Sequence, residues 1–254
     1  MLLAIDCGNT NTVFTLFESE IKLSEWRLET VLRRPADEYF IALCHVLESQ
    51  KLHYTDIKNC ILASVVPVVT HHLVRFCEER LALTPMVIGE EGVKLNLDVQ
   101  TDDPAQVGAD RLVNAVAVAA AGDVPAIILD FGTATTFDVL IGNTYFGGII
   151  APGVRLSLNT LSDKATLIPK IDLKKINKVI GNNTISAVRS GFFWGYAGLI
   201  DNIINLIKKE TRKSFKVIIT GGFSNLFKNS IKKTKASHNQ DITIKGLIKI
   251  SKLI

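Results

Sequence analysis

The feature of the sequence that most constrains its fold is a pattern that occurs twice. An apolar run ends on an aspartate, turns on glycine, hydroxyl and amide residues, and continues as a second β-branched run, first over residues 3–13 and again over 126–140. An ungapped alignment of the two copies matches four positions: Asp6 with Asp130, Gly8 with Gly132, Asn11 with Thr135, and Thr12 with Thr136. Each copy is typical of a hairpin that presents backbone N–H groups, hydroxyls and one carboxylate at the end of a buried strand. We expect two similar halves that direct these turns towards something between them; the alternative is two ordinary hairpins with polar turns.

The chain is long enough to bury a full core, as one large or two modest domains. Of its 254 residues, 47% are hydrophobic and 21% are charged, which is typical of a globular protein. No apolar stretch approaches the roughly 18 residues that span a bilayer, and Asp6 interrupts the N-terminal apolar run where a secretory signal would continue. Four cysteines lie in apolar segments without CxxC spacing: Cys7, Cys44, Cys60 and Cys77. We therefore expect a cytoplasmic protein with reduced thiols and no membrane span.

The net charge of +4 is distributed unevenly along the chain. Residues 208–254 contain 12 Lys and Arg against 2 acidic residues, a balance of +10, so residues 1–207 carry −6. A basic segment of this size is compatible with nucleic-acid binding. Because its lysines alternate with helix-forming and strand-forming residues, we interpret it as a solvated face and expect no specific nucleic-acid partner.

The order of the predicted elements indicates an α/β fold. In the first half, hydrophobic periodicity predicts three strands, a helix, a strand, a helix and a strand, over residues 3–30, 36–49, 60–63, 68–81 and 86–88. A polar loop over 94–108 leads into an alanine-rich helix that ends near residue 121. The second half begins with its own hairpin and then contains, in order, helices near 154–161 and 184–209, a strand over 217–222, a short helix and an apolar segment over 242–253.

The predicted helix over residues 184–209 is apolar around most of its circumference. Its aromatic and aliphatic residues spread over more than one face, and Gly191, Gly195 and Gly198 form a stripe that would permit close backbone approach. A helix of this kind is buried on both sides, inside the domain or against a second subunit. We interpret its aromatic residues as core or dimer contacts rather than as a cofactor site.

The residue types in the two turns are suited to binding phosphate. Asp6 and the residues after it can hold a hydrated Mg²⁺ and cradle phosphate oxygens, and the Asp130 turn offers a second set with Thr133 and Thr135. The sequence contains neither GxxxxGK[ST] nor GxGxxG, so the common nucleotide signatures are absent. The strand ending in Thr220-Gly221-Gly222 could let an adenine approach its backbone, but a plain strand-to-helix turn explains it equally well.

The segment Gly108-Ala109-Asp110-Arg111 opens the alanine-rich helix. Asp110 stands where the N-cap of that helix is expected, a structural role that requires no ligand. Arg111 does not fit this explanation, because a cation in the first turn opposes the helix dipole. An anion beside Arg111 explains it better, either a ligand carboxylate or a partner aspartate. Asn182-Asn183-Thr184 opens the long helix, where one residue can cap the helix and another can contact a substrate.

Five motifs, in this order along the chain, resemble those of type III pantothenate kinases: DCGNTN at 6–11, GADR at 108–111, DFGTAT at 130–135, GGIIAPG at 147–153 and GNNT at 181–184. Residues 241–247 are similar to the end of that family's chains, so the resemblance covers the whole sequence. It implies the acetate and sugar kinase/Hsc70/actin fold, with two ribonuclease-H-like domains of duplicated βββαβαβα topology, here residues 1–121 and 122–254, and a nucleotide cleft between them. It also implies a homodimer, ATP with a divalent metal such as Mg²⁺, and a monovalent cation, K⁺ or NH₄⁺.

The resemblance also implies roles for individual residues. ATP and its metal would be bound by one continuous segment and one further threonine: Asp6, Cys7, Gly8, Asn9, Thr10, Asn11, Thr12, Val13 and Thr133. Pantothenate would be bound by the GADR motif and by the first residue of the predicted long helix: Gly108, Ala109, Asp110, Arg111 and Thr184. Asp110 would be the catalytic base, Asp6 would hold the divalent cation, and Asp130 would ligate the monovalent cation.

The activity implied is transfer of the ATP γ-phosphoryl group to the primary hydroxyl of pantothenate, giving 4′-phosphopantothenate in the first step of coenzyme A biosynthesis. One alternative is a transcriptional regulator of the same fold, the Bvg accessory factor, although the carboxylates Asp6, Asp110 and Asp130 disfavour it. Another is a different small-molecule kinase or phosphohydrolase of the superfamily. One departure concerns Thr101, because many family members have a Tyr there, so an aromatic substrate contact at this position is not expected.

Overall fold

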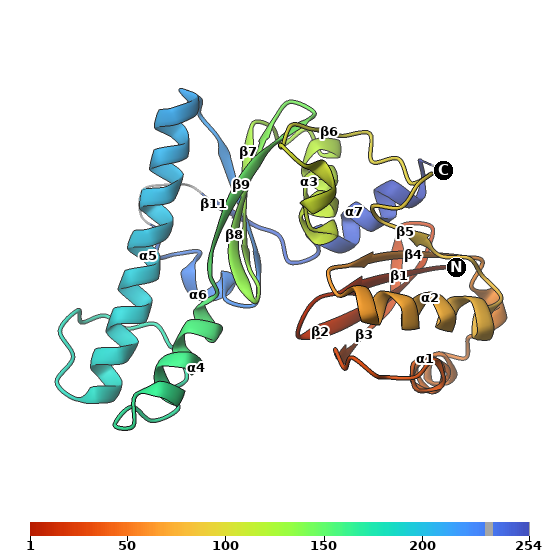
Figure 1. The fold of residues 1–254 in the computed structure, drawn as a ribbon, viewed down its shortest axis with the longest axis horizontal. Helices are drawn as coiled ribbons and strands as arrows, with labels where there is room; N and C mark the ends of the chain where they lie inside the picture. The colour runs from red at the N-terminus through yellow and green to blue at the C-terminus, as the bar shows by residue number, and fades with distance from the viewer. Residues whose placement is uncertain (232–235, 254) are drawn as a thin grey trace. The chain divides into compact units, whose positions relative to one another are not determined.

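The computed structural model describes residues 1–231 and 236–253, which form two compact units (Figure 1). Unit 1 contains Met1–Leu97, Asp102–Ala121 and Ile242–Ile254, and unit 2 contains Asp98–Thr101 and Gly122–Asp241. These units differ from the predicted domains, residues 1–121 and 122–254, at the short segment after Leu97 and at the C-terminus.

Unit 1 is built on a five-stranded sheet with the order β3-β2-β1-β4-β5. Its strands are β1 (Leu2–Cys7), β2 (Asn11–Glu18), β3 (Ile21–Glu29), β4 (Asn59–Ser64) and β5 (Met86–Val87). The first three strands are antiparallel, whereas β4 is parallel to β1 and β5 is parallel to β4. The carboxyl ends of β1 and β4 therefore lie at one edge of the sheet, next to the turn that follows Asp6.

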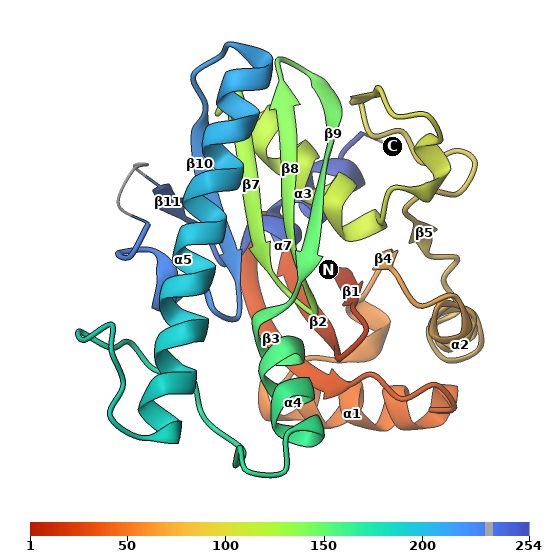
Figure 2. The same ribbon diagram turned by 60° about the vertical axis from the view of Figure 1, so that its left-hand side comes forward.

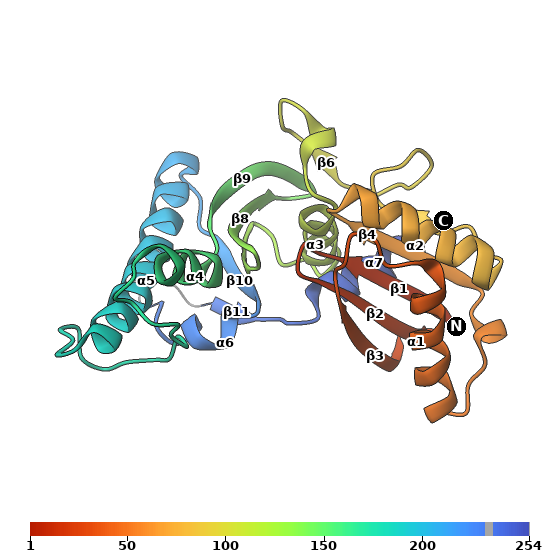
Figure 3. The same ribbon diagram turned by 60° about the horizontal axis from the view of Figure 1, so that its bottom comes forward.

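Helices cover both faces of this sheet (Figures 1 and 3). On one face, α1 (Ala36–Ser49) and α2 (Pro67–Leu81) bury Tyr39, Leu43 and Phe76 against Ile5 and Phe14. The predicted helices over 36–49 and 68–81 are thus confirmed. The 3₁₀ turns η1 (Tyr54–Asp56) and η2 (Pro104–Gln106) lie in the connecting segments.

The other face of the unit 1 sheet is covered by α3 (Ala109–Ala120) and α7 (Ile242–Ser251). A Cβ at Gly246 would overlap the Val113 backbone, so the two helices approach closely at this glycine. The apolar residues Ile244, Leu247 and Ile250 are buried in the same cluster as Val113. Burial of this apolar face explains why the C-terminal helix belongs to unit 1 and not, as predicted, to the second domain.

Unit 2 is built on a sheet with the order β11-β10-β7-β8-β9-β6. Its strands are β6 (Asp98–Val99), β7 (Ala126–Phe131), β8 (Ala134–Ile141), β9 (Thr144–Pro152), β10 (Lys216–Gly221) and β11 (Ala236–His238). The segment β9-β8-β7-β10-β11 repeats the strand order and directions of unit 1. This repetition confirms the predicted duplication. The additional strand β6 pairs with β9 and lies in the stretch over 94–108 that was predicted to be a loop.

The helices of unit 2 are α4 (Val154–Lys164), α5 (Thr184–Thr211) and α6 (Ser224–Phe227). Figure 2 shows α5 running alongside β10 and β7. Phe193, Ile200 and Ile204 are buried against Ile127 and Phe137, so the predicted long helix is confirmed as a core element on this side. None of the helices within the described residues is long and apolar enough to cross a membrane.

Candidate active site

The turn after Asp6 connects β1 to β2 at the carboxyl edge of the unit 1 sheet. Its backbone is closed by a hydrogen bond from the Gly8 N–H to the Asn11 carbonyl, 3.0 Å. Asn9, Thr10 and Asn11 are exposed. The turn therefore offers free surface for a ligand at the end of a buried strand, as its sequence predicted.

The predicted ATP-binding segment is divided between the two faces of the sheet. Cys7 and Thr12 pair across β1 and β2, are fully or almost fully buried, and share a contact of 3.5 Å from the Thr12 Oγ1 to the Cys7 Sγ. Cys7 belongs to the core beneath α1 and α2. Asp6 pairs with Val13 and points to the opposite face, because neighbouring residues of a strand alternate sides. Side chains of Cys7 and Thr12 thus shape the turn from within the core.

Asp110 lies in the first turn of α3, on the same unit as Asp6. The N-cap of α3 is Gly108, so the prediction that Asp110 caps this helix was wrong. Asp110 Oδ1 instead accepts a hydrogen bond from the Arg111 N–H, 2.8 Å. A Cβ at residue 108 would lie 2.7 Å from that oxygen and 3.5 Å from Val65 Cγ1, so glycine leaves the room that the carboxylate occupies.

The two carboxylates Asp6 and Asp110 lie close enough to affect each other. Burial raises the pKa of the Asp6 carboxyl from 3.8 to about 7, and the charge of Asp110 acts in the same direction. Burial also raises the pKa of Asp110, an effect opposed by the hydrogen bond and the charge of Arg111. Paired, partly buried carboxylates of this kind are suited to a divalent cation or to accepting a proton. The described residues contain no group of three or more His, Cys, Asp or Glu that could hold a metal ion.

Arg27 is a charged residue of this site that the sequence analysis did not identify. It lies on β3 opposite Val13, which in turn lies opposite Asp6, so the three residues occupy one row across the sheet. Its positive charge lowers the pKa of Asp6. The alternation of β3 contained a usable signal, since Trp26 and Leu28 pack against the core and Arg27 therefore faces the other side.

The turn after Asp130 holds the corresponding position in unit 2. Asp130 pairs with Thr220 of β10, and the Gly222 N–H donates to the Phe131 carbonyl, 3.0 Å. A Cβ at Gly221 would overlap both the Asp130 carboxylate and the Phe131 backbone. The predicted residue Asp130 therefore lies beside the glycine turn of β10, whereas the Thr133 carbonyl lies against Gly153, the N-cap of α4. Both residues belong to unit 2.

The register of the hairpins corrects one detail of the predicted duplication. In unit 1, Cys7 pairs with Thr12, whereas in unit 2 Phe131 pairs with Thr135. Residues 8–11 thus form the first turn and residues 132–134 the second, which is one residue shorter. Thr12 corresponds to Thr135, not to Thr136 as the ungapped alignment had it, and both are fully buried.

Thr184 lies apart from the Asp130 turn within unit 2. It is the first residue of α5 and is exposed, while Asn183 caps the helix by accepting from the Ser186 N–H, 2.9 Å. Near the middle of α5, the Tyr196 hydroxyl donates to the carbonyl of Pro152, which pairs with Ala134 beside the turn. Thr184 precedes Tyr196 by about three helical turns, roughly 18 Å along the axis. Thr101 lies beside Gly147 of β9.

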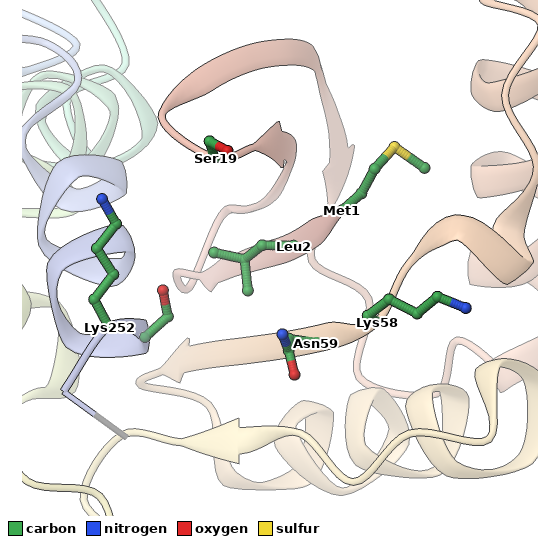
Figure 4. A pocket seen from close by; sticks show the side chains of 7 residues that line it. Met1, Leu2, Ser19, Lys58, Asn59 and Lys252 are labelled. Atoms are coloured by element: carbon green, nitrogen blue, oxygen red, sulfur yellow. The ribbon is translucent and has the colours of Figure 1, made fainter.

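A hollow of about 280 Å³ lies at the other end of the unit 1 sheet. It is lined by Met1, Leu2, Ser19, Lys58, Asn59, Ser251 and Lys252 (Figure 4). Figure 4 shows the Lys58 and Lys252 side chains pointing away from each other; Lys252 pairs with Glu20, and Lys58 donates to the Thr55 carbonyl. The hollow contains no predicted site residue, and Leu2 begins the strand whose other end carries Asp6.

Comparison with known sequences gives consistent matches over the whole chain. A family model described as type III pantothenate kinase matches residues 2–206. A type III pantothenate kinase of Pelagibacter ubique is 51% identical over 257 aligned positions, covering 100% of both chains. One from Rhodospirillum centenum is 45% identical over 252 positions, covering 97% of this chain and 96% of its own.

Solved structures share the arrangement at much lower identity. A Campylobacter jejuni protein described as a Baf family transcriptional activator superimposes with a TM-score of 0.58 and 19% identity, covering 99% of this chain and 98% of its own. A Sinorhizobium meliloti protein described as a 2-dehydro-3-deoxygalactonokinase gives a TM-score of 0.62 and 11% identity, covering 100% and 97%. At such identities the likeness concerns the fold alone, and it confirms the predicted fold class of actin-like ATPases and sugar kinases.

Proposed function

The chain belongs to the type III pantothenate kinase family, and we propose that it transfers the γ-phosphoryl group of ATP to the primary hydroxyl of pantothenate. This reaction gives 4′-phosphopantothenate, the first step towards coenzyme A. The observation that carries the proposal is the pairing of Asp6 with Asp110 beside the exposed turn of unit 1, where burial raises the pKa of both carboxyls. Phosphoryl transfer requires mainly positioning and charge neutralisation; this arrangement offers positioning directly, and neutralisation would come from a divalent cation held at Asp6.

Each predicted site residue receives a role on this proposal. The turn from Asp6 to Val13 binds the ATP phosphates, with Thr133 as a further ATP contact. Asp6 holds Mg²⁺, which supplies charge neutralisation at the phosphates when bound. Asp130 ligates K⁺ or NH₄⁺ at the end of β7, where its carboxylate lies beside the Gly221 turn.

The acceptor is bound by the first turn of α3. Gly108 and Ala109 let the substrate approach the helix terminus, and Arg111 pairs with the pantothenate carboxylate. Asp110 accepts the proton of the reacting hydroxyl, because burial raises its pKa and makes it a better base than an exposed aspartate. Thr184 is a further pantothenate contact on this proposal, carried over from the family motif alone.

The test is a direct assay of the purified protein. It is incubated with ATP, Mg²⁺, K⁺ and pantothenate, and the product is identified by mass as phosphopantothenate. Omitting K⁺, and replacing it by NH₄⁺ or Na⁺, tests the monovalent cation in the same assay. Absence of phosphopantothenate with all components present would contradict the proposal, and turnover independent of the monovalent cation would remove that role from Asp130.

We also propose a homodimer, in the cytoplasm, with α5 contributing to the interface. A Cβ at Gly191, Gly195 or Gly198 would meet no atom within 4 Å, so this glycine stripe has no packing partner among the described residues. Ile185 and Leu206 of the same helix are exposed to 42% and 51%. A second copy seated on this face would bury those side chains and use the stripe for close approach; sedimentation equilibrium at micromolar concentration measures the assembly.

The regulator alternative is less well supported. A DNA-binding module does not require two partly buried carboxylates at one turn, and the Campylobacter jejuni likeness concerns the fold alone. We expect duplex DNA at about 150 mM salt to bind no more tightly than the non-specific range of roughly 10⁻⁴–10⁻⁶ M. A nanomolar, sequence-dependent complex would favour the regulator instead.

A further inference from the structure

Thr30 contacts the turn after Asp6 at three points, although it lies outside every motif described above. The Thr30 N–H donates to the Thr10 carbonyl, 3.0 Å, and the Thr30 hydroxyl donates to the Gly8 carbonyl, 2.7 Å. The hydroxyls of Thr30 and Thr12 lie 3.0 Å apart. Thr30 directly follows β3, so this strand reaches across the hairpin to hold the exposed turn.

The hydrogen atoms of these contacts can be assigned from the donor inventory. A threonine hydroxyl has a single proton, and that of Thr30 is directed to the Gly8 carbonyl. In the contact between the two hydroxyls, Thr30 is therefore the acceptor, and the single Thr12 proton is shared between the Thr30 hydroxyl at 3.0 Å and the Cys7 Sγ at 3.5 Å. Thr12 is itself fully buried, so the chain of hydroxyls connects the exposed turn to the rigid core.

These contacts also fix the direction of the backbone N–H groups. In a planar trans peptide, the carbonyl of one residue and the N–H of the next point in opposite directions. Because Thr30 holds the carbonyls of Gly8 and Thr10, the N–H groups of Asn9 and Asn11 must point away from Thr30. Both residues are exposed, which is the surrounding that an anion bound by these N–H groups requires.

We propose that Thr30 is a positioning residue for phosphoryl transfer: it orients the Asn9 and Asn11 N–H groups towards the phosphates of the nucleotide. The inference rests on the proposed function, because it takes the turn after Asp6 to be the phosphate site. Thr30 touches no reacting atom. It acts through the turn, and its effect falls on the nucleotide rather than on the acceptor.

The test compares Thr30→Val, which keeps the size and removes the hydroxyl, with Thr30→Ser, which keeps the hydroxyl. For Thr30→Val we expect kcat/KM for ATP to fall about tenfold or more, since the buried side of the Gly8 carbonyl loses its donor. KM for pantothenate should change less than about twofold, and Thr30→Ser should restore kcat/KM to within about threefold of the wild-type value. The control is Thr211→Val, which removes a hydroxyl that donates to the Ile207 carbonyl at the end of α5, 2.7 Å, and should leave both parameters unchanged.

A second measurement keeps this test separate from the proposed function. Binding of a non-hydrolysable ATP analogue with Mg²⁺, followed by calorimetry, does not depend on the acceptor and should weaken at least about fivefold in Thr30→Val. A wild-type protein that binds the analogue but leaves pantothenate unchanged would contradict the function and not the role of Thr30. Unchanged analogue affinity in folded Thr30→Val, or in Thr30→Ala if the valine variant does not fold, would overturn that role, and so would a loss that serine does not restore.

Discussion

The two aspartate turns occupy the same position in two sheets of the same topology, yet they are built differently. The turn of unit 1 has four residues between its paired strands, and that of unit 2 has three. The longer turn is exposed and is held by hydroxyl groups, chiefly Thr30 and Thr12. The shorter turn is held by close backbone contacts at Gly153 and Gly221, where a Cβ would overlap the Thr133 carbonyl and the Phe131 backbone.

This difference indicates how a duplicated element can acquire two tasks. An extra residue and side-chain anchors give the first turn room for a bulky ligand, and hydrogen bonds can yield by small amounts as that ligand binds. Backbone packed against backbone cannot yield in this way, because close-packed atoms leave no free volume. We therefore infer that the first turn adapts to the phosphates, whereas the second holds Asp130 rigidly for a small ion.

The largest effects should come from the aspartates that the two turns share. We expect Asp6→Asn and Asp130→Asn each to lower turnover by about 10³-fold or more, because each removes a charge from the cation environment of the transferred group. Both variants should remain folded; Asp6→Asn in particular removes a carboxyl whose pKa is already raised by burial. Turnover and thermal unfolding are measured together. Normal turnover in either folded variant would show that only one of the turns takes part in the reaction.

Substitution of Asp110, beside the first turn, tests whether its carboxylate accepts a proton in the reaction. Asp110→Asn keeps the shape but cannot accept a proton, so we expect kcat to fall by about 10²–10³-fold, the lower half of the usual range for a general base. The lower half applies because the proton moves late in a loose transition state. Arg111→Ala should act differently, mainly raising KM for pantothenate. An Asp110→Asn enzyme within about threefold of wild-type kcat would leave Asp110 only a structural role in the first turn of α3.

Much of the fold could be predicted from the sequence, because apolar periodicity is a local signal. The helix over 36–49 and the hairpin at Asp130 are examples. Three features depended on information that a local pattern does not contain. The extra residue in the first turn is visible only in the strand register. The N-cap lies at Gly108, where a Cβ would meet the Asp110 carboxylate at 2.7 Å, a contact that appears only in the folded chain. The C-terminal helix joins unit 1 because α3 offers it an apolar face distant in sequence.

The candidate active site could likewise be predicted from the sequence only in part. Motif residues such as Asp6 and Asp110 could be identified, since their types and spacing carry chemical meaning. Thr30 could not, because a single hydroxyl after a strand is common, and for Arg27 the alternation of its strand indicated a face but not the neighbouring Asp6. Their importance follows only from the register that places Arg27 in the row of Asp6 and brings Thr30 to Gly8.

Glycine substitutions test whether the two turns are really held in different ways. Gly153→Ala and Gly221→Ala should each lower the free energy of unfolding by about 2–3 kcal/mol, because the new methyl group overlaps backbone that cannot move aside. Gly221 also has φ +85°, which disfavours alanine. Gly8→Ala should cost less than about 1 kcal/mol, since its Cβ would meet only the Asn11 carbonyl at 3.4 Å. Urea unfolding measures all three; equal losses would contradict the contrast between the turns.

The smallest expected effect concerns glycines of unit 2 for which the described residues provide no packing partner. Gly195 lies on the exposed side of α5, where a Cβ would meet no atom within 4 Å. Within one chain, Gly195→Ala should therefore stabilise the helix by about 0.5–1 kcal/mol. If the stripe packs against a second copy, however, the methyl group holds the two helices apart, and we expect the dimer dissociation constant to rise about tenfold. Sedimentation equilibrium separates the two effects, with His45→Ala on an exposed position of α1, away from the stripe, as the control for helix propensity alone. Greater stability of Gly195→Ala with unchanged association would mean that this glycine, unlike Gly153 and Gly221, serves no close contact.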